Sequence, residues 1–177
     1  MKIAFVGPAA VGKDAASNYV AKKFNLTHIS SGDLVREHIT KNNLGTLDRP
    51  NLRVIAKKLR DENGGDVLVR IALEKTPDNI ILSGLRTVDE VNTFKKMGGK
   101  IVALDAPKEK RYEWAKSRGR IGDDVSFESF ELMEKKESVD KDRNSQNVVP
   151  VMALADIEIS NDGEIDDLFR KLDSLGS

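Results

Sequence analysis

The chain has 177 residues, carries 29 basic (Lys and Arg) and 29 acidic (Asp and Glu) side chains, and contains no cysteine and two histidines. The balanced charge gives no overall field that would attract nucleic acid or an acidic membrane, and no apolar stretch approaches the roughly 20 residues that a membrane span needs. Disulfides and thiol chemistry are excluded, and two histidines do not supply a structural zinc site, so we expect a cytoplasmic protein that binds neither nucleic acid nor membrane.

The first elements are a short strand, a glycine-bearing loop and a helix. Residues 2–6 read KIAFV, which is typical of a buried parallel strand, and apolar residues recur at helical spacing over residues 12–24. The loop between them reads GPAAVGKD. The pattern G-x-x-x-x-G-K-[ST] in this setting wraps backbone N–H groups around nucleotide phosphates. It predicts an ATP-binding loop made of Gly7, Pro8, Ala9, Ala10, Val11, Gly12, Lys13, Asp14 and Ala15.

The last letter of this pattern is unusual. Asp14 stands where a Ser or Thr hydroxyl normally meets Mg²⁺. A carboxylate beside a triphosphate is repelled unless a cation lies between them. The loop therefore predicts a nucleotide site whose metal ligands differ from the common arrangement.

The rest of the chain alternates apolar strand-like runs with amphipathic helical stretches. This alternation predicts an α/β fold of three layers, a five-stranded parallel sheet with helices on both faces. Thr87 to Glu90 form a predicted capping box, residues 119–124 a mobile loop, and residues 127–142 a helix with a solvated, charged face. Further strands are predicted at 27–30, 79–83, 100–105 and 156–160, and further helices at about 33–41, 51–62, 66–75, 87–97, 107–117 and 163–175.

Two segments after the loop resemble the adenylate kinase family. Residues 30–36 (SSGDLVR) resemble the family's S-x-G-D-x-x-R segment, and residues 81–87 (ILSGLRT) resemble its third-strand D-G-F-P-R-T. The resemblance implies that Arg36 and Arg86 bind the phosphate of an acceptor, with Asp33 beside them. Guanidinium groups suit this task because they hold phosphate oxygens bidentately.

The resemblance continues to the end of the chain in the family's order. Residues 101–105, Arg111 and the triplet Arg118-Gly119-Arg120 resemble the fourth strand and the lid, whose arginines close over the transferred phosphoryl group. Asn161 begins a turn that resembles the one packing near the adenine base. The resemblance implies one P-loop nucleoside monophosphate kinase domain over residues 1–177, with an acceptor-binding insertion at about 31–76 and a short lid at about 118–126. The catalytic set would be Lys13, Arg86, Arg118 and Arg120.

One departure concerns the metal site. Ser83 stands where the family has an acidic residue that holds the Mg²⁺ shell. Relative to the family, a carboxylate is present at position 14 and absent at position 83. We hypothesise that the two departures compensate and that Asp14 binds Mg²⁺, with Asp105, which also ends an inner strand, as the second candidate.

The sequence leaves the identity of the phosphate acceptor undetermined. Arginine-rich contacts favour a nucleoside or deoxynucleoside monophosphate, bound by a monomer or homodimer. Dephospho-CoA kinase is an alternative whose hydroxyl acceptor benefits from a general base, with Asp33 as the candidate, and a slow ATP-hydrolysing switch is another. Asp33 also suits a helix cap, and Arg36, Arg118 and Arg120 also suit solvated surface charge. Three more arginines, Arg49, Arg53 and Arg60, are expected at the surface.

Overall fold

The computed structural model describes residues 1–119 and 124–176. The strands are β1 (Lys2–Val6), β2 (Thr27–Ser30), β3 (Ile80–Ser83), β4 (Lys100–Asp105) and β5 (Ile157–Ser160). The helices are α1 (Lys13–Phe24), α2 (Ser31–Asn42), α3 (Arg49–Asn63), α4 (Val67–Lys75), α5 (Val88–Lys96), α6 (Lys108–Arg118), α7 (Phe127–Ser138), α8 (Val148–Met152), α9 (Ile165–Leu172) and a short 3₁₀ helix, η1 (Asp173–Gly176). Within the described ranges, no helix combines the length and apolar character that a membrane crossing requires.

The strands form one parallel sheet in the order β2-β3-β1-β4-β5. The central strand β1 pairs with β3 on one side and with β4 on the other, so Phe5 lies opposite both Ser83 and Val102. The predicted five-stranded parallel sheet is confirmed. In open sheets of this kind, ligands bind outside the carboxyl ends of the strands where the strand order reverses, and here that point is the end of β1.

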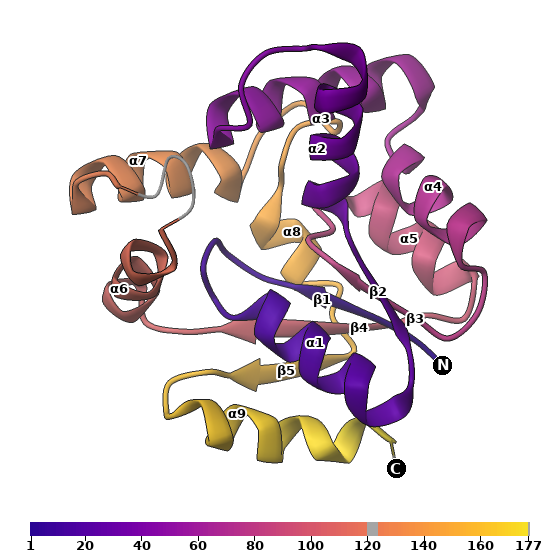
Figure 1. Ribbon diagram of the computed structural model, residues 1–177, viewed down its shortest axis with the longest axis vertical. Helices are drawn as coiled ribbons and strands as arrows, with labels where there is room; N and C mark the ends of the chain where they lie inside the picture. Colours follow the sequence, from indigo (N-terminus) through magenta and orange to yellow (C-terminus); the bar gives the residue numbers. More distant parts are fainter. Residues whose placement is uncertain (120–123, 177) are drawn as a thin grey trace.

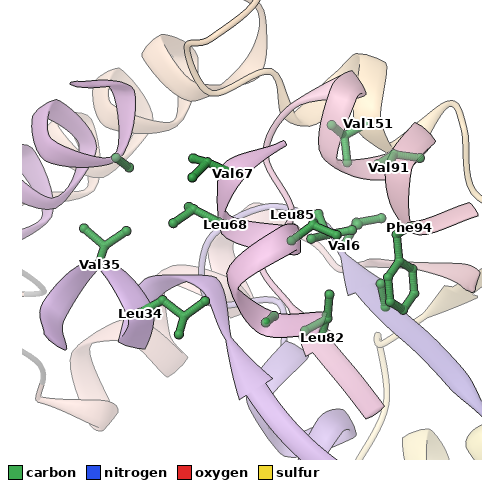
Figure 2. Close-up of a cluster of buried hydrophobic side chains, with 14 of the residues drawn as sticks. Val6, Leu34, Val35, Val67, Leu68, Leu82, Leu85, Val91, Phe94 and Val151 are labelled. Atoms are coloured by element: carbon green, nitrogen blue, oxygen red, sulfur yellow. The ribbon is translucent and has the colours of Figure 1, made fainter. Parts of the chain in front are cut away.

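Helices cover both faces of the sheet, as Figure 1 shows. The alternation of side chains along β1 separates two buried clusters. Ala4 and Val6 pack with apolar residues of α2, α3, α4, α5 and α8, and Figure 2 shows part of this cluster, including Val6, Leu82 and Phe94. Ile3 and Phe5 pack with residues of α1 and α9 on the opposite face. The result is the expected three-layer arrangement.

The chain after α7 differs from the prediction. The helix expected to run to residue 142 ends at Ser138, because the next residue is extended and the Asp140 N–H donates to Oδ1 of Asn147 (2.6 Å). Asn147 also precedes α8, a short helix that the sequence reading missed. Val148 and Val151 of α8 are buried, and Pro150 is tolerated because it lies in the first turn.

The turn from β1 to α1 depends on two glycines in the left-handed half of backbone space. Gly7 has φ of +139° and Gly12 has φ of +95°. A Cβ at Gly7 would lie 2.3 Å from the Leu104 carbonyl oxygen, a backbone atom of β4. The loop can therefore leave the sheet in this direction only because position 7 has no side chain.

A buried carboxylate joins the insertion to the end of β3. Glu90 forms the predicted capping box with Thr87, which confirms that prediction. Its Oε1 accepts from Nε (2.9 Å) and Nη2 (2.8 Å) of Arg60 in α3, and its Oε2 accepts from the Arg86 N–H (2.6 Å). The Arg60 and Glu90 side chains are 1% and 0% exposed. Arg60 is therefore not at the surface as predicted, because the Glu90 carboxylate neutralises it inside the protein.

We expect Glu90→Gln to destabilise the fold by about 3 kcal/mol, since removing one charge leaves the buried Arg60 guanidinium uncompensated. Urea denaturation monitored by circular dichroism measures this free energy of unfolding. Glu62→Gln is the matched control, because Glu62 pairs with Lys58 at an exposed site and should change stability by less than about 0.5 kcal/mol. Equal effects of the two changes would contradict this account.

We expect Gly7→Ala to destabilise the protein more than Gly98→Ala. Both positions have positive φ. This backbone conformation destabilises a residue with a side chain by about 1 kcal/mol relative to glycine. A Cβ at Gly98 meets nothing within 4 Å, whereas the contact with Leu104 at position 7 should add about 1–3 kcal/mol. Thermal and urea denaturation of both variants test the difference, and similar losses would show that the close approach to β4 does not matter.

Candidate functional site

A cavity of about 690 Å³ opens at the carboxyl end of β1. One side of it is the phosphate-binding loop with the start of α1, and the other side is the insertion of α2, α3 and α4. Its polar lining includes the cationic side chains of Lys13, Arg36, Arg49, Arg60, Arg86, Lys110 and Arg118. Its apolar lining on the insertion side consists of Val35, Leu47, Leu52, Ala56 and Leu68.

Lys13 is buried at the base of the loop. Its Nζ donates to the carbonyl oxygens of Gly7 (2.9 Å) and Pro8 (2.6 Å). Burial lowers the pKa of the Lys13 ammonium well below its usual value, and the Arg86 charge lowers it further, while the nearby Asp14 opposes the shift. The ammonium is thus held over the loop by two carbonyls that an anionic ligand would replace.

Positions 14 and 83, which the sequence reading linked, lie side by side. The Ser83 hydroxyl donates to Oδ1 of Asp14 at 3.4 Å, a long hydrogen bond. Ser83 also lies 2.9 Å from Nε2 of His28, and the other nitrogen of that ring lies 2.9 Å from Oδ1 of Asn18. Burial lowers the pKa of His28, which favours a neutral ring. Asp14 and Ser83 both line the cavity.

Arg86 lies between the loop and the insertion. Its Nη1 donates to the Gly7 carbonyl at 3.4 Å, and its backbone N–H is held by Glu90. Burial lowers the pKa of the Arg86 guanidinium, and the negative charge of Glu137 opposes that shift. In the same wall, Nη1 of Arg60 is buried and makes no hydrogen bond. The arginine of the third-strand segment therefore lines the cavity.

The insertion side also contains an ion pair that sequence reasoning missed. Nε and Nη2 of Arg49 donate to the two carboxylate oxygens of Glu137, each at 2.7 Å. The Arg49 side chain is only 22% exposed, so it is not the surface residue that was predicted. The helix α7 does expose charged residues such as Lys135 and Lys136, but Glu137 on it is buried, at 4% exposure. No signal in the sequence indicates this pair, because the pattern of a charged helix does not reveal which carboxylate turns inward.

Of the remaining predicted site residues, some line the cavity and others do not. Arg36 lines the cavity and pairs with the exposed Asp33 at 2.8 Å, while Asp33 itself does not line it. Arg118 lines the cavity at the end of α6. Arg120 and the middle of the expected lid, residues 120–123, lie outside the described residues. Asp105 is exposed and is not among the cavity residues, so the structure does not bring the second metal candidate to the site.

Two further residues hold the loop in place. The Asn161 side chain donates to the Val11 carbonyl (3.1 Å), and its backbone N–H donates to the Asp105 carbonyl (2.7 Å). The guanidinium of Arg111 donates to the Ala106 and Ala9 carbonyls and pairs with Glu134. Arg111 does not line the cavity, so it braces the loop from behind instead of facing a ligand.

The metal ion that the cavity could hold is Mg²⁺. Among the residues that the structure describes, no three His, Cys, Asp or Glu side chains gather to hold an ion. Mg²⁺ in nucleotide sites is bound through one or two carboxylates together with phosphate oxygens and water. Asp14, the carboxylate that lies within the phosphate-binding loop, is compatible with that mode of binding.

The sequence matches the AAA_17 family model, described as an AAA domain, over residues 6–131. It is 32% identical to a UPF0200 protein of Thermococcus onnurineus, over 87% of this chain and 85% of that protein. It is 30% identical to a UPF0200 protein of Methanocaldococcus jannaschii, over 98% and 87%. A UPF0200/UPF0201 protein of Archaeoglobus fulgidus is 32% identical over 96% of this chain, which spans about half (53%) of that relative's length.

Solved structures with the same fold include two kinases. Shikimate kinase from Bacteroides thetaiotaomicron superposes with a TM-score of 0.64 at 14% identity, over 99% of this chain and 97% of that one. A gluconokinase from Sinorhizobium meliloti gives 0.56 at 10% identity, over 97% and 88%. These likenesses establish the P-loop kinase fold. The family model and the sequence relatives show that the chain belongs to the AAA domain family and to the UPF0200 proteins.

Proposed function

We propose that this protein is a phosphotransferase that moves the γ-phosphoryl group of ATP to a small phosphorylated acceptor, a nucleoside or deoxynucleoside monophosphate. One observation carries the proposal: the loop lysine and a cluster of insertion arginines line the same cavity. A protein that only binds or hydrolyses a nucleotide needs only the phosphate-binding loop. A second anionic substrate also needs cations on the opposite side of the cavity, and the arginines of α2, α3 and the end of β3 supply them.

Phosphoryl transfer requires mostly positioning and charge stabilisation. In our proposal, the backbone N–H groups of residues 9–15 hold the α- and β-phosphates, and Lys13 leaves the two loop carbonyls to contact the β- and γ-phosphates. Arg86 and Arg36 hold the acceptor phosphate. Arg86, between the two phosphates, would neutralise charge on the transferred group, and Arg118 would contact the donor from the α6 side.

Mg²⁺ bound together with ATP would neutralise charge on the phosphate groups. Asp14 is the residue of this chain that would hold it. The contact between Asp14 and Ser83 supports the hypothesis of an exchange, because a carboxylate at either position would reach the same volume. Asp14 would thereby supply from α1 the negative charge that, by resemblance, the adenylate kinase family supplies from the third strand.

An ADP-release assay with ATP and Mg²⁺ tests the proposal against a panel of nucleoside monophosphates, deoxynucleoside monophosphates and dephospho-CoA. We expect turnover to be nearly silent without an acceptor and to rise with one class of monophosphate, because water is a poor competitor in a kinase site. Selective turnover of dephospho-CoA would identify the alternative kinase. Equal ADP release with and without every acceptor would contradict the proposal in favour of a switch.

We expect Arg86→Lys to lower kcat/KM for the acceptor by about 100-fold, because a lysine cannot hold two phosphate oxygens bidentately. Steady-state kinetics with the acceptor found in the panel measure this. Arg143→Lys is the control, since Arg143 is exposed and pairs with Asp89 on the surface. A wild-type value for Arg86→Lys would show that Arg86 does not contact the transferred or acceptor phosphate.

We expect Asp14→Ser to lower Mg²⁺-dependent turnover by at least about tenfold and to raise the Mg²⁺ concentration required, because the site loses its carboxylate. The double variant Asp14→Ser with Ser83→Asp should recover most of the activity if the two positions exchange roles. Asp105→Ala should behave as wild type. An unaffected Asp14→Ser variant would refute the role of Asp14.

A further inference from the structure

The cavity contains a charge of the wrong sign for a phosphate site. Glu137 of α7 is buried, lines the cavity, and pairs bidentately with Arg49 of α3. Burial raises the pKa of the Glu137 carboxyl, but the positive charges of Arg49, Arg86 and Lys13 outweigh it and lower the pKa overall. An ionised carboxylate therefore lies among the cations that would hold the acceptor.

The other cations of the site have different partners. Lys13 donates to loop carbonyls, which are neutral. Arg36 pairs with Asp33, which is exposed and outside the cavity lining. Among these interactions, the one between Arg49 and Glu137 places a full negative charge within the cavity wall. Its bidentate geometry is the one that a guanidinium uses for either a carboxylate or a phosphate.

We propose that Glu137 is an internal anion that occupies the acceptor-phosphate subsite beside Arg49 and Arg86, and that a ligand phosphate displaces it. The carboxylate then keeps the buried arginines neutralised while the site is empty. It also sets a threshold for ligands, because an incoming anion must bind Arg49 better than Glu137 does. A phosphomonoester dianion meets this threshold more readily than a carboxylate, since it carries more charge and more acceptor oxygens.

The position of Glu137 suits displacement. It is the second-last residue of α7, and the chain after Ser138 is extended at the exposed Val139. Earlier on the same helix, Glu131 pairs with Lys108 and Glu134 pairs with Arg111, both in α6. Figure 1 shows α7 extending from beside α6 toward α3. The last turn of α7 can therefore move away from Arg49 while the two earlier pairs keep the helix attached to α6.

Titration calorimetry with inorganic phosphate tests this directly. We expect Glu137→Gln to bind phosphate at least about fivefold more tightly than wild type, because the competing internal state is removed. Glu128→Gln is the matched control: it makes the same change of charge on the same helix, at an exposed position outside the cavity lining. Equal gains in both variants, or no gain in Glu137→Gln, would overturn the proposal.

A second variant locates the effect. In the double variant Arg49→Gln with Glu137→Gln, the gain in phosphate affinity should disappear, because the guanidinium released by Glu137→Gln is absent. A gain that persists would mean that phosphate is responding at the loop, and it would overturn the placement of the subsite. Circular dichroism establishes that each variant is folded.

A measurement on the wild-type protein does not depend on any variant. We expect saturating phosphate to increase amide hydrogen exchange in residues 135–140 while leaving residues 127–134 unchanged, since only the last turn of α7 is released. Unchanged or slower exchange in residues 135–140 would overturn the proposal. The inference rests on the proposed function only in naming the subsite as that of the acceptor. Because phosphate binding requires neither ATP nor transfer, a failed ADP-release assay and a failed phosphate response are separate results.

Discussion

The arrangement of the site depends on the buried carboxylate of Glu90. Its two oxygens accept hydrogen bonds from Arg60 of α3 and from the backbone at the end of β3. A buried carboxylate requires such partners because an unpaired charge would be strongly destabilising inside the protein. These hydrogen bonds attach α3 of the insertion to the chain at the end of β3, and one of them is made by the backbone of Arg86. The direction of Arg86 and the position of α3 are consequently not independent.

The site is a concentration of positive charge that the folded chain must tolerate without a ligand. It does so with nearby acceptors: loop carbonyls for Lys13, the Gly7 carbonyl for Arg86, and the Glu137 carboxylate for Arg49. These contacts hold the cations close to the positions where a ligand would need them, which lowers the ordering cost of binding. They also mean that ligand binding exchanges hydrogen bonds instead of only adding them.

The contact between positions 14 and 83 follows from the register of the sheet. Phe5 pairs with Ser83 across the two parallel strands, and α1 returns from the loop along β1 and β3. The second residue of α1 therefore faces the end of β3. The side chains at these two positions are therefore in contact, although the positions are 69 residues apart in the chain.

Local patterns in the sequence determined the parallel α/β fold, the phosphate-binding loop and the capping box at Thr87, because strand and helix periodicity, glycine spacing and capping residues act over a few neighbours. They also pointed to Arg86, which lies three residues past the end of β3 and lines the cavity. Tertiary structure alone decided that Arg60 is buried, that Glu137 turns into the cavity and that Asp105 turns away from it. A charged residue on an amphipathic helix is compatible with either solvent or a buried partner, and the partners here, Glu90 for Arg60 and Arg49 for Glu137, are brought together only when the helices pack.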